Sequence, residues 1–157
     1  MITCQFEDGN KVSLRHVVTD TLLFNKENEI LLVKRAPHLL CGNMYGIVGG
    51  FVERDETITE TVIREVKEET GYEVVDSFLF RIIDKPERPK EERQNISFVY
   101  VATAGEKIGK PDDESLHMKW FPLDKLPHES EFAFDHYEDI TLYKKYLQKK
   151  FPLPLLD

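Results

Sequence analysis

The sequence has little cysteine, no long apolar run and no leader-like start. Only two cysteines occur, Cys4 and Cys41, and neither belongs to a CxxC pair. This excludes a disulfide framework and a cysteine zinc site, and it suits a reducing compartment. No apolar stretch approaches the roughly 18 residues of a membrane span, and the first residues lack the basic and apolar regions of a signal peptide. We therefore expect a cytoplasmic protein with no membrane partner.

An excess of positive charge is also missing. The 21 Lys and Arg residues stand against 29 Asp and Glu, giving a formal net charge of −8. Such a chain is unsuited to a broad phosphate-binding surface, so long nucleic acid is not an expected partner. With 157 residues, 41% of them hydrophobic, the chain can bury one core. We expect a single domain over residues 1–157, with its core at 15–145 and a frayed, proline-containing tail at 151–157.

The best-defined element is an amphipathic helix with both ends marked. Apolar side chains recur every three or four positions, which predicts a helix with one buried face. Thr57 followed by Glu60 forms a capping box, and Gly71 suits the left-handed position after the last turn. The sequence therefore predicts a helix over 57–70. Its apolar positions are Ile58, Val62, Ile63 and Val66.

Three glutamates lie in the second half of this helix. At about 100° per residue, Glu65 and Glu69 fall within roughly 20° of the apolar face and Glu68 about 80° from it. Neighbouring like charges repel by roughly 0.2–0.5 kcal/mol per pair, and the helix dipole disfavours anions here by about 0.3–1 kcal/mol each. A solvated charged face is one explanation. A hard divalent cation held by carboxylates is the other, and we favour it.

The stretch 50–72 resembles the signature of the Nudix hydrolases, G-x5-E-x7-R-E-U-x-E-E-x-G-U, in which U is apolar. Every specified position is filled, with a tyrosine as a lenient last apolar residue. The matching residues are Gly50, Glu56, Arg64, Glu65, Val66, Glu68, Glu69, Gly71 and Tyr72. The resemblance implies an α+β fold, an αβα sandwich with a mixed β-sheet between helices. It also implies a metal-dependent hydrolase of a nucleoside diphosphate linked to a further group.

The resemblance implies a role for several side chains. Mg²⁺ or Mn²⁺ is the expected cofactor, with Glu65, Glu68 and Glu69 as its ligands. Glu65 is expected to be catalytic, together with Arg64, whose fork of donors would orient the carboxylates. Nudix enzymes commonly recruit one more acid from the loop before the strand at 116–121, and here Glu114 is the candidate. The alternative for that acidic loop is a solvent-facing turn.

Substrate contacts are expected from three places in the chain. A double glycine can let a ligand approach the backbone, although a bulge is the alternative. An arginine closes the strand at 30–35, where many Nudix enzymes carry a basic residue, and its planar fork matches phosphate oxygens. The charged loop 84–94 can be a mobile surface loop or a substrate lid. The candidate substrate-binding residues are Arg35, Gly49, Gly50, Arg88 and Arg93.

The remaining elements follow from alternation, apolar runs and turn residues. We expect a hairpin at 2–6 and 12–14, strands at 15–24, 30–35, 44–53 (broken by the glycines), 73–83, 95–103 and 116–121, a helical turn at 122–126 and a helix at 134–149. The histidines are scattered and receive no ligand role.

Three function classes fit these features, and we favour the enzyme. Its expected substrate is ADP-ribose or a similar nucleotide sugar, because the stretch 50–53, Arg35 and the loop at 84–93 resemble those of ADP-ribose and dinucleoside-type Nudix enzymes. A diphosphate with a second bulky group also needs a long groove, which the loop 84–94 can wall. The alternative substrate is a nucleoside triphosphate, oxidised or not. A non-catalytic nucleotide sensor would have lost a catalytic glutamate, and a regulator would need a DNA-binding half for which we expect no residues. The sequence leaves a homodimer open.

Overall fold

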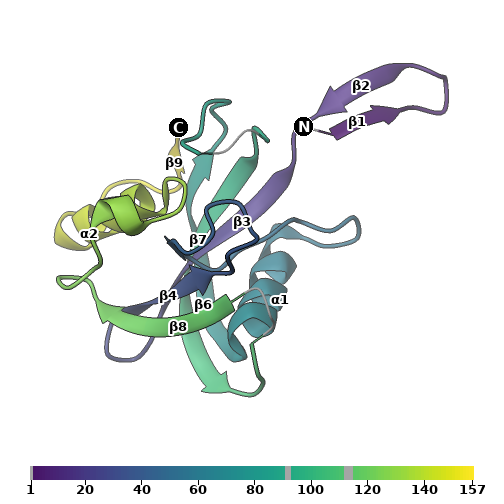
Figure 1. Ribbon diagram of the computed structural model, residues 1–157. Coiled ribbons are helices and arrows are strands. Elements are labelled where there is room, and N and C mark those ends of the chain that lie inside the picture. Colours follow the sequence, from purple (N-terminus) through teal and green to yellow (C-terminus); the bar gives the residue numbers. More distant parts are fainter. Residues whose placement is uncertain (1, 91–92, 112–114) are drawn as a thin grey trace.

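The protein is described by a computed structural model covering residues 2–90, 93–111 and 115–157. Within these residues a seven-stranded mixed sheet lies between helices α1 (Ile58–Thr70) and α2 (His136–Gln148), which cover opposite faces (Figure 1). The predicted αβα sandwich is therefore confirmed. The strands of the sheet are β3 (Val17–Phe24), β4 (Glu29–Arg35), β5 (Tyr45–Gly46), β6 (Tyr72–Ile83), β7 (Ile96–Lys107), β8 (Ser115–Pro122) and β9 (Leu155–Leu156).

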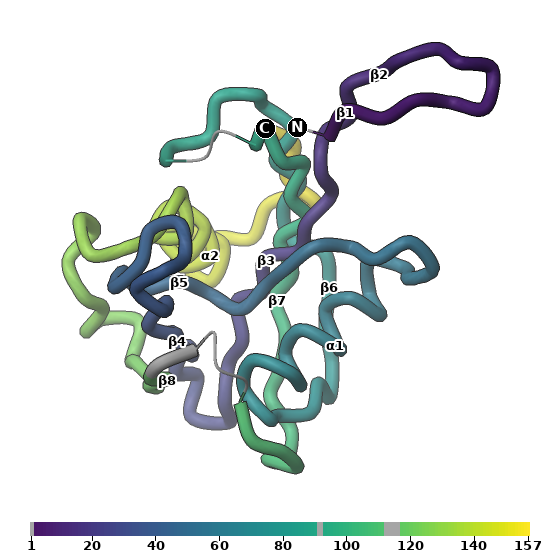
Figure 2. The backbone as a smooth tube through the Cα atoms, turned by 45° about the vertical axis from the view of Figure 1, so that its right-hand side comes forward, coloured from purple at the N-terminus to yellow at the C-terminus, as the bar shows by residue number. Residues whose placement is uncertain are grey.

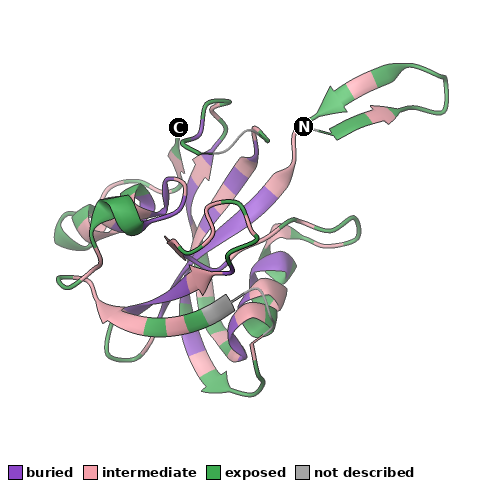
Figure 3. Ribbon diagram, viewed as in Figure 1, coloured by how far each residue is buried: buried purple, intermediate pink, exposed green. Residues whose placement is uncertain are grey.

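The strand order runs β5-β4-β3-β7-β6-β9, with β8 paired to β4. Strands β3 and β7 are parallel, as are β6 and β9, whereas the other pairs are antiparallel. Successive side chains of β3 point to opposite faces of the sheet, so the core has one half on each face. Leu22 packs with Ile140 on the α2 side, and Leu23 packs with Val66 on the α1 side. Figure 3 shows these buried strands between the partly exposed helices.

Helix α1 begins and ends where the sequence predicts. Thr57 and Glu60 form the capping box, and Gly71 takes a left-handed conformation with φ of 76°. Val62 is fully buried, but Ile63 is 46% exposed. The expectation that Ile63 widens the apolar face was wrong, because five residues at about 100° each place it roughly 140° from Ile58.

Two predicted elements are shorter in the structure. The strand expected at 44–53 is regular only over β5, after which single bridges join Val48 to Thr21 and Phe51 to Val18. After β5, which pairs with β4, the chain thus runs alongside β3 before α1 begins. The expected helical turn at 122–126 is a turn in which the N–H of Lys125 donates to the carbonyl of Pro122, and a 3-10 helix follows at Glu129–Glu131.

The expectation of a frayed tail was wrong. Strand β9 pairs in parallel with β6, and Asp157 forms an ion pair with Arg81. Arg81 is 1% exposed and also pairs with Glu138 and Asp139 of α2. A buried guanidinium requires partners for its charge and its donors, so it draws the end of the chain back onto the sheet.

The predicted N-terminal hairpin is confirmed as β1 (Ile2–Gln5) paired with β2 (Lys11–Leu14). It extends away from the rest of the molecule in both backbone views (Figures 1 and 2). Cys4 and Cys41 are free thiols, as expected. Of the helices in the described residues, none has the length and apolar character to cross a membrane.

Candidate active site

The Nudix-like stretch forms one wall of a cavity of about 500 Å³. Helix α1 contributes the arginine and the glutamates, and the double glycine precedes them along the same wall. The other walls come from β3, the loop 36–43, the loop 84–94 and the start of α2. The lining residues expected from the sequence are Arg35, Gly49, Gly50, Arg64, Glu65, Glu68, Glu69, Arg88 and Arg93.

Arg64 holds the acidic side chains in place, as predicted. Its Nε donates to Glu56 Oε1 at 2.6 Å, and its Nη1 donates to Glu65 Oε1 at 2.7 Å and to Glu68 Oε2 at 3.1 Å. Its Nη2 donates to the carbonyl of Phe51 at 3.0 Å, which ties the helix to the segment before it. The hydrogen bond from Arg64 lowers the pKa of Glu56 to about 2.

The double glycine is required by its neighbours in the protein. A Cβ on Gly50 would lie 2.2 Å from Oε1 of Glu65, and a Cβ on Gly49 would lie 2.1 Å from the carbonyl oxygen of Thr19. The N–H of Gly49 donates to Oε1 of Glu69 at 3.1 Å. The glycines therefore let the glutamates of α1 approach the backbone beside β3, which is a different reason from the direct ligand contact that the sequence suggested.

The donor set on α1 fits a hard divalent cation in its chemistry, because Glu65, Glu68 and Glu69 present carboxylate oxygens to one cavity. Gly50 leaves room for the carboxylate of Glu65 at the backbone. Among residues 2–90, 93–111 and 115–157, however, no group of three or more His, Cys, Asp or Glu side chains is arranged to hold a metal. Arg64 instead pairs with two of the three glutamates. Metal ligation by these glutamates stays a prediction.

Two guanidinium groups that line the cavity lie against aromatic rings. Arg35 lies over Phe134, with 5.2 Å between its Cζ and the ring centroid, and Arg93 lies over Phe51 at 5.6 Å. The Nε of Arg35 donates to the carbonyl of Leu40, which shapes the loop 36–43. Both arginines line the cavity, so the structure brings these two predicted residues to the glutamates.

Arg88 has a different setting from the solvated charge or substrate contact expected of it. It is 6% exposed, and its Nε donates to Asp135 Oδ2 at 2.9 Å while its Nη2 donates to Asp20 Oδ2 at 3.3 Å. It borders the cavity, but these donors anchor the loop 84–94 to β3 and α2. The expectation of a mobile surface loop is therefore wrong around Arg88, because burying this charge requires both carboxylates.

Two residues of the site were missed in the sequence. Asp20 is the one charged residue of β3, and His136 is the first residue of α2. Burial would raise the pKa of Asp20, but the hydrogen bond with His136, the charge of Arg88 and a hydrogen bond from Ser97 hold it below its ordinary value. A lone aspartate within an apolar strand was the available signal. His136 received no role because nothing local distinguishes it from the other histidines.

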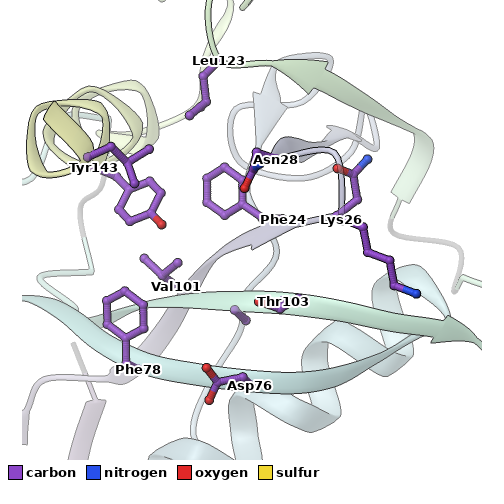
Figure 4. Close-up of a pocket in the computed structure, with 12 residues that line it drawn as sticks. Phe24, Lys26, Asn28, Asp76, Phe78, Val101, Thr103, Leu123 and Tyr143 are labelled. Atoms are coloured by element: carbon purple, nitrogen blue, oxygen red, sulfur yellow. The ribbon is translucent and has the colours of Figure 1, made fainter.

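A second cavity of about 510 Å³ lies between the turn after β3 and helix α2. Figure 4 shows Phe24, Phe78 and Tyr143 around this space. Of the described residues that line it, only Asp76 is acidic, and none belongs to the Nudix-like stretch. The first cavity is therefore the candidate active site. Glu114, the expected additional acid, lies outside the described residues.

Comparison with known proteins decides the family. The family model described as NUDIX domain matches residues 14–142. The chain belongs to the Nudix family. As a Nudix hydrolase it acts on pyrophosphate bonds. An ADP-ribose pyrophosphatase of Methanocaldococcus jannaschii is 35% identical over 125 residues, which are 79% of this chain and 70% of that protein. Other curated relatives are longer, and this chain spans between 30% and 48% of five of them.

Solved structures agree with the Nudix fold. A NUDIX hydrolase from Nitrosomonas europaea superposes with a TM-score of 0.78 at 20% identity, covering 99% of this chain and 91% of that one. A bifunctional NMN adenylyltransferase/ADP ribose pyrophosphatase from Francisella tularensis, complexed with AMP and a Mn ion, has a TM-score of 0.65 at 25% identity. That match covers 89% of this chain and 43% of the other. The first of these likenesses shows the fold alone.

Proposed function

We propose that this Nudix hydrolase cleaves the diphosphate bridge of ADP-ribose or a similar nucleotide sugar, with Mg²⁺ or Mn²⁺ as its cofactor. One observation carries the proposal. The cavity of about 500 Å³ combines the glutamates of α1 with two arginine–phenylalanine pairs, Arg35 with Phe134 and Arg93 with Phe51. A volume between about 300 and 1,000 Å³ is typical of pockets that bury ligands of this size.

The two ends of such a substrate need different partners. A diphosphate requires positive charge, and Arg35 and Arg93 present planar guanidinium groups that match phosphate oxygens. A purine base or a ribose requires apolar faces, and Phe51, which is 44% exposed, and Phe134 offer aromatic rings beside the same arginines. Arg93, together with Arg88, which Asp135 holds, supplies the wall that encloses the second bulky group.

We assign the hydrolysis step to the wall of the cavity that α1 forms. Glu65, Glu68 and Glu69 would hold the divalent metal, which when bound supplies charge neutralisation and a more acidic water. Arg64 orients Glu65 and Glu68, and the N–H of Gly49 orients Glu69. A carboxylate held within hydrogen-bond distance of its partners keeps one position, which transition-state stabilisation requires.

Relatives support the same substrate class. The Methanocaldococcus jannaschii protein is an ADP-ribose pyrophosphatase by name, and the match spans 79% of this chain. The Francisella tularensis protein, a bifunctional NMN adenylyltransferase/ADP ribose pyrophosphatase, has a structure in complex with AMP and a Mn ion. Cytoplasmic location and formation of a homodimer stay predictions from the sequence.

The experiment is a side-by-side assay of ADP-ribose and nucleoside triphosphates with product identification. Cleavage of ADP-ribose gives AMP and ribose 5-phosphate, whereas a triphosphate gives a monophosphate and pyrophosphate. We expect the highest kcat/KM for ADP-ribose or another nucleotide sugar. A kcat/KM for every nucleotide sugar far below that for a triphosphate would overturn the proposed substrate and leave the hydrolase class unchanged.

A further inference from the structure

One backbone segment is hydrogen-bonded both to the start of α2 and to a glutamate of α1. His136, which is 2% exposed, accepts the backbone N–H of Ile47 at its Nδ1 over 3.2 Å. Two residues later, the N–H of Gly49 donates to Glu69. A methyl group on Gly46 would lie 3.4 Å from the same Nδ1. The imidazole therefore packs directly against the backbone that leads to the double glycine.

The contacts of the two ring nitrogens together determine the tautomer of the His136 imidazole. Nε2 of His136 lies 3.4 Å from Oδ1 of Asp20, and Asp20 is itself held by Ser97 and Arg88. Because Nδ1 accepts a backbone N–H, the proton of the neutral ring is on Nε2, where it points at a carboxylate. Both nitrogens are engaged within the protein. His136 is thus placed to hold the backbone, and it is not placed to take a proton from a reacting water.

The segment that His136 holds is also hydrogen-bonded to β3 on its other side. The carbonyls of Val48 and Gly50 accept from the N–H groups of Thr21 and Thr19 at 2.7 and 2.9 Å. The hydrogen bond at Ile47 fixes the side of the segment that faces α2. Loss of this contact would remove the support at Ile47, so that the glycine backbone could rotate about its hydrogen bonds to β3. Gly49 and Gly50 would then move relative to Glu69 and Glu65, which they touch.

We propose that His136 is a positioning residue for hydrolysis, which sets where the glycine backbone holds the carboxylates of Glu65 and Glu69. The inference rests on the proposed function for the reaction that it serves. Asp20 orients the imidazole, and Arg88 and Ser97 keep Asp20 in place. Since His136 acts on the glutamates and not on the bulk of the substrate, its loss lowers kcat more than it raises KM.

Two substitutions separate the two hydrogen bonds of the ring. His136→Asn keeps an acceptor near the position of Nδ1, whereas His136→Gln keeps a donor near the position of Nε2 and loses that acceptor. We expect His136→Gln to lower kcat roughly 10- to 100-fold with KM changed less than about threefold, because small displacements of reacting groups cost this much. His136→Asn should retain kcat within about fivefold of the wild type. His117→Gln, an exposed histidine of β8, is the control and should match the wild type.

Nitrogen NMR of the wild-type protein supplies a test that needs neither substrate nor folded variants. It should show that His136 is protonated at Nε2 and unprotonated at Nδ1. A ring protonated at Nδ1 would overturn the proposal. Equal kcat losses in the Asn and Gln variants, or a larger loss in Asn, would overturn it too. If the wild type leaves ADP-ribose intact, the proposed substrate fails. The same variants are then compared on the nucleotide that it hydrolyses, and the tautomer still tests the hydrogen bond from Ile47 on which the role of His136 depends.

Discussion

Replacing Gly50 with alanine should separate activity from stability. The new Cβ would lie 2.2 Å from Oε1 and 2.6 Å from Oε2 of Glu65, so the carboxylate must move. These atoms are the end of a flexible side chain, and the backbone can stay in place. The structural loss is mainly the hydrogen bond between Arg64 and Glu65, whose net contribution is about 0.5–1.5 kcal/mol.

The effect on catalysis should be far larger. A displacement of a reacting group by roughly 1 Å lowers turnover about 100-fold, so Gly50→Ala should lose kcat by that order. Gly49→Ala is the matched variant, because its Cβ would lie 2.1 Å from the carbonyl oxygen of Thr19. This atom belongs to the backbone of β3 and cannot swing away. Overpacking of this kind destabilises by about 1–3 kcal/mol, and we expect Gly49→Ala to lie at the upper end.

The assay combines urea unfolding, followed by circular dichroism, with kcat for ADP-ribose on the same preparations. Gly50→Ala should unfold close to the wild type and be nearly inactive. Gly49→Ala should unfold at clearly lower urea. Wild-type kcat in Gly50→Ala, or a greater loss of stability in Gly50→Ala than in Gly49→Ala, would refute the placement of Glu65 against the glycine.

Three further substitutions test the fold and the charges around the site. Val62→Asp places an unpaired charge at a fully buried position and should lower the free energy of unfolding by about 3 kcal/mol or more, which denaturant titration measures. Arg81→Met leaves Asp139 buried without its cation and should destabilise by about 3–5 kcal/mol in the same titration. The pKa of Glu56 falls from 4.5 to about 2 on pairing with Arg64, so this group stabilises the fold above pH 4.5 and the contribution is lost as pH falls toward 2. Glu56→Gln should therefore lose less stability than the wild type over that pH range, and an unchanged pH dependence would contradict the pairing.

Local patterns in the sequence were enough to predict the helix of the site and its caps. The period of the apolar residues identifies the buried Val62 and Val66, and it places Glu65 and Glu69 beside them. Arg64 donates hydrogen bonds to Glu65 and Glu68, as its predicted orienting role requires. These contacts all lie within a few residues along one helix. Spacing alone therefore fixes them.

Contacts between segments that are distant in the sequence could not be predicted from local spacing. Arg88 meets Asp20 and Asp135 across 68 and 47 residues, and His136 meets Ile47 across 89. The loop 84–94 has the composition of a solvated segment, and only the fold brings carboxylates to its buried arginine. The same holds for the end of the chain, since Arg81, a buried residue near the end of β6, pairs with Asp157 and draws it back onto the sheet.

The central claim is that the glutamates of α1 hold a divalent metal for hydrolysis. The direct measurement is kcat/KM for ADP-ribose with Mg²⁺ in the wild type, in Glu69→Gln and in the control Glu73→Gln, an exposed residue of β6 beyond the helix. Glu69→Gln is nearly isosteric and should fold normally but lose about 100-fold or more in kcat/KM and bind metal weakly, while the control stays at the wild-type value. The wild type should be inactive in EDTA. Full turnover in EDTA, or wild-type rates in Glu69→Gln, would contradict the account.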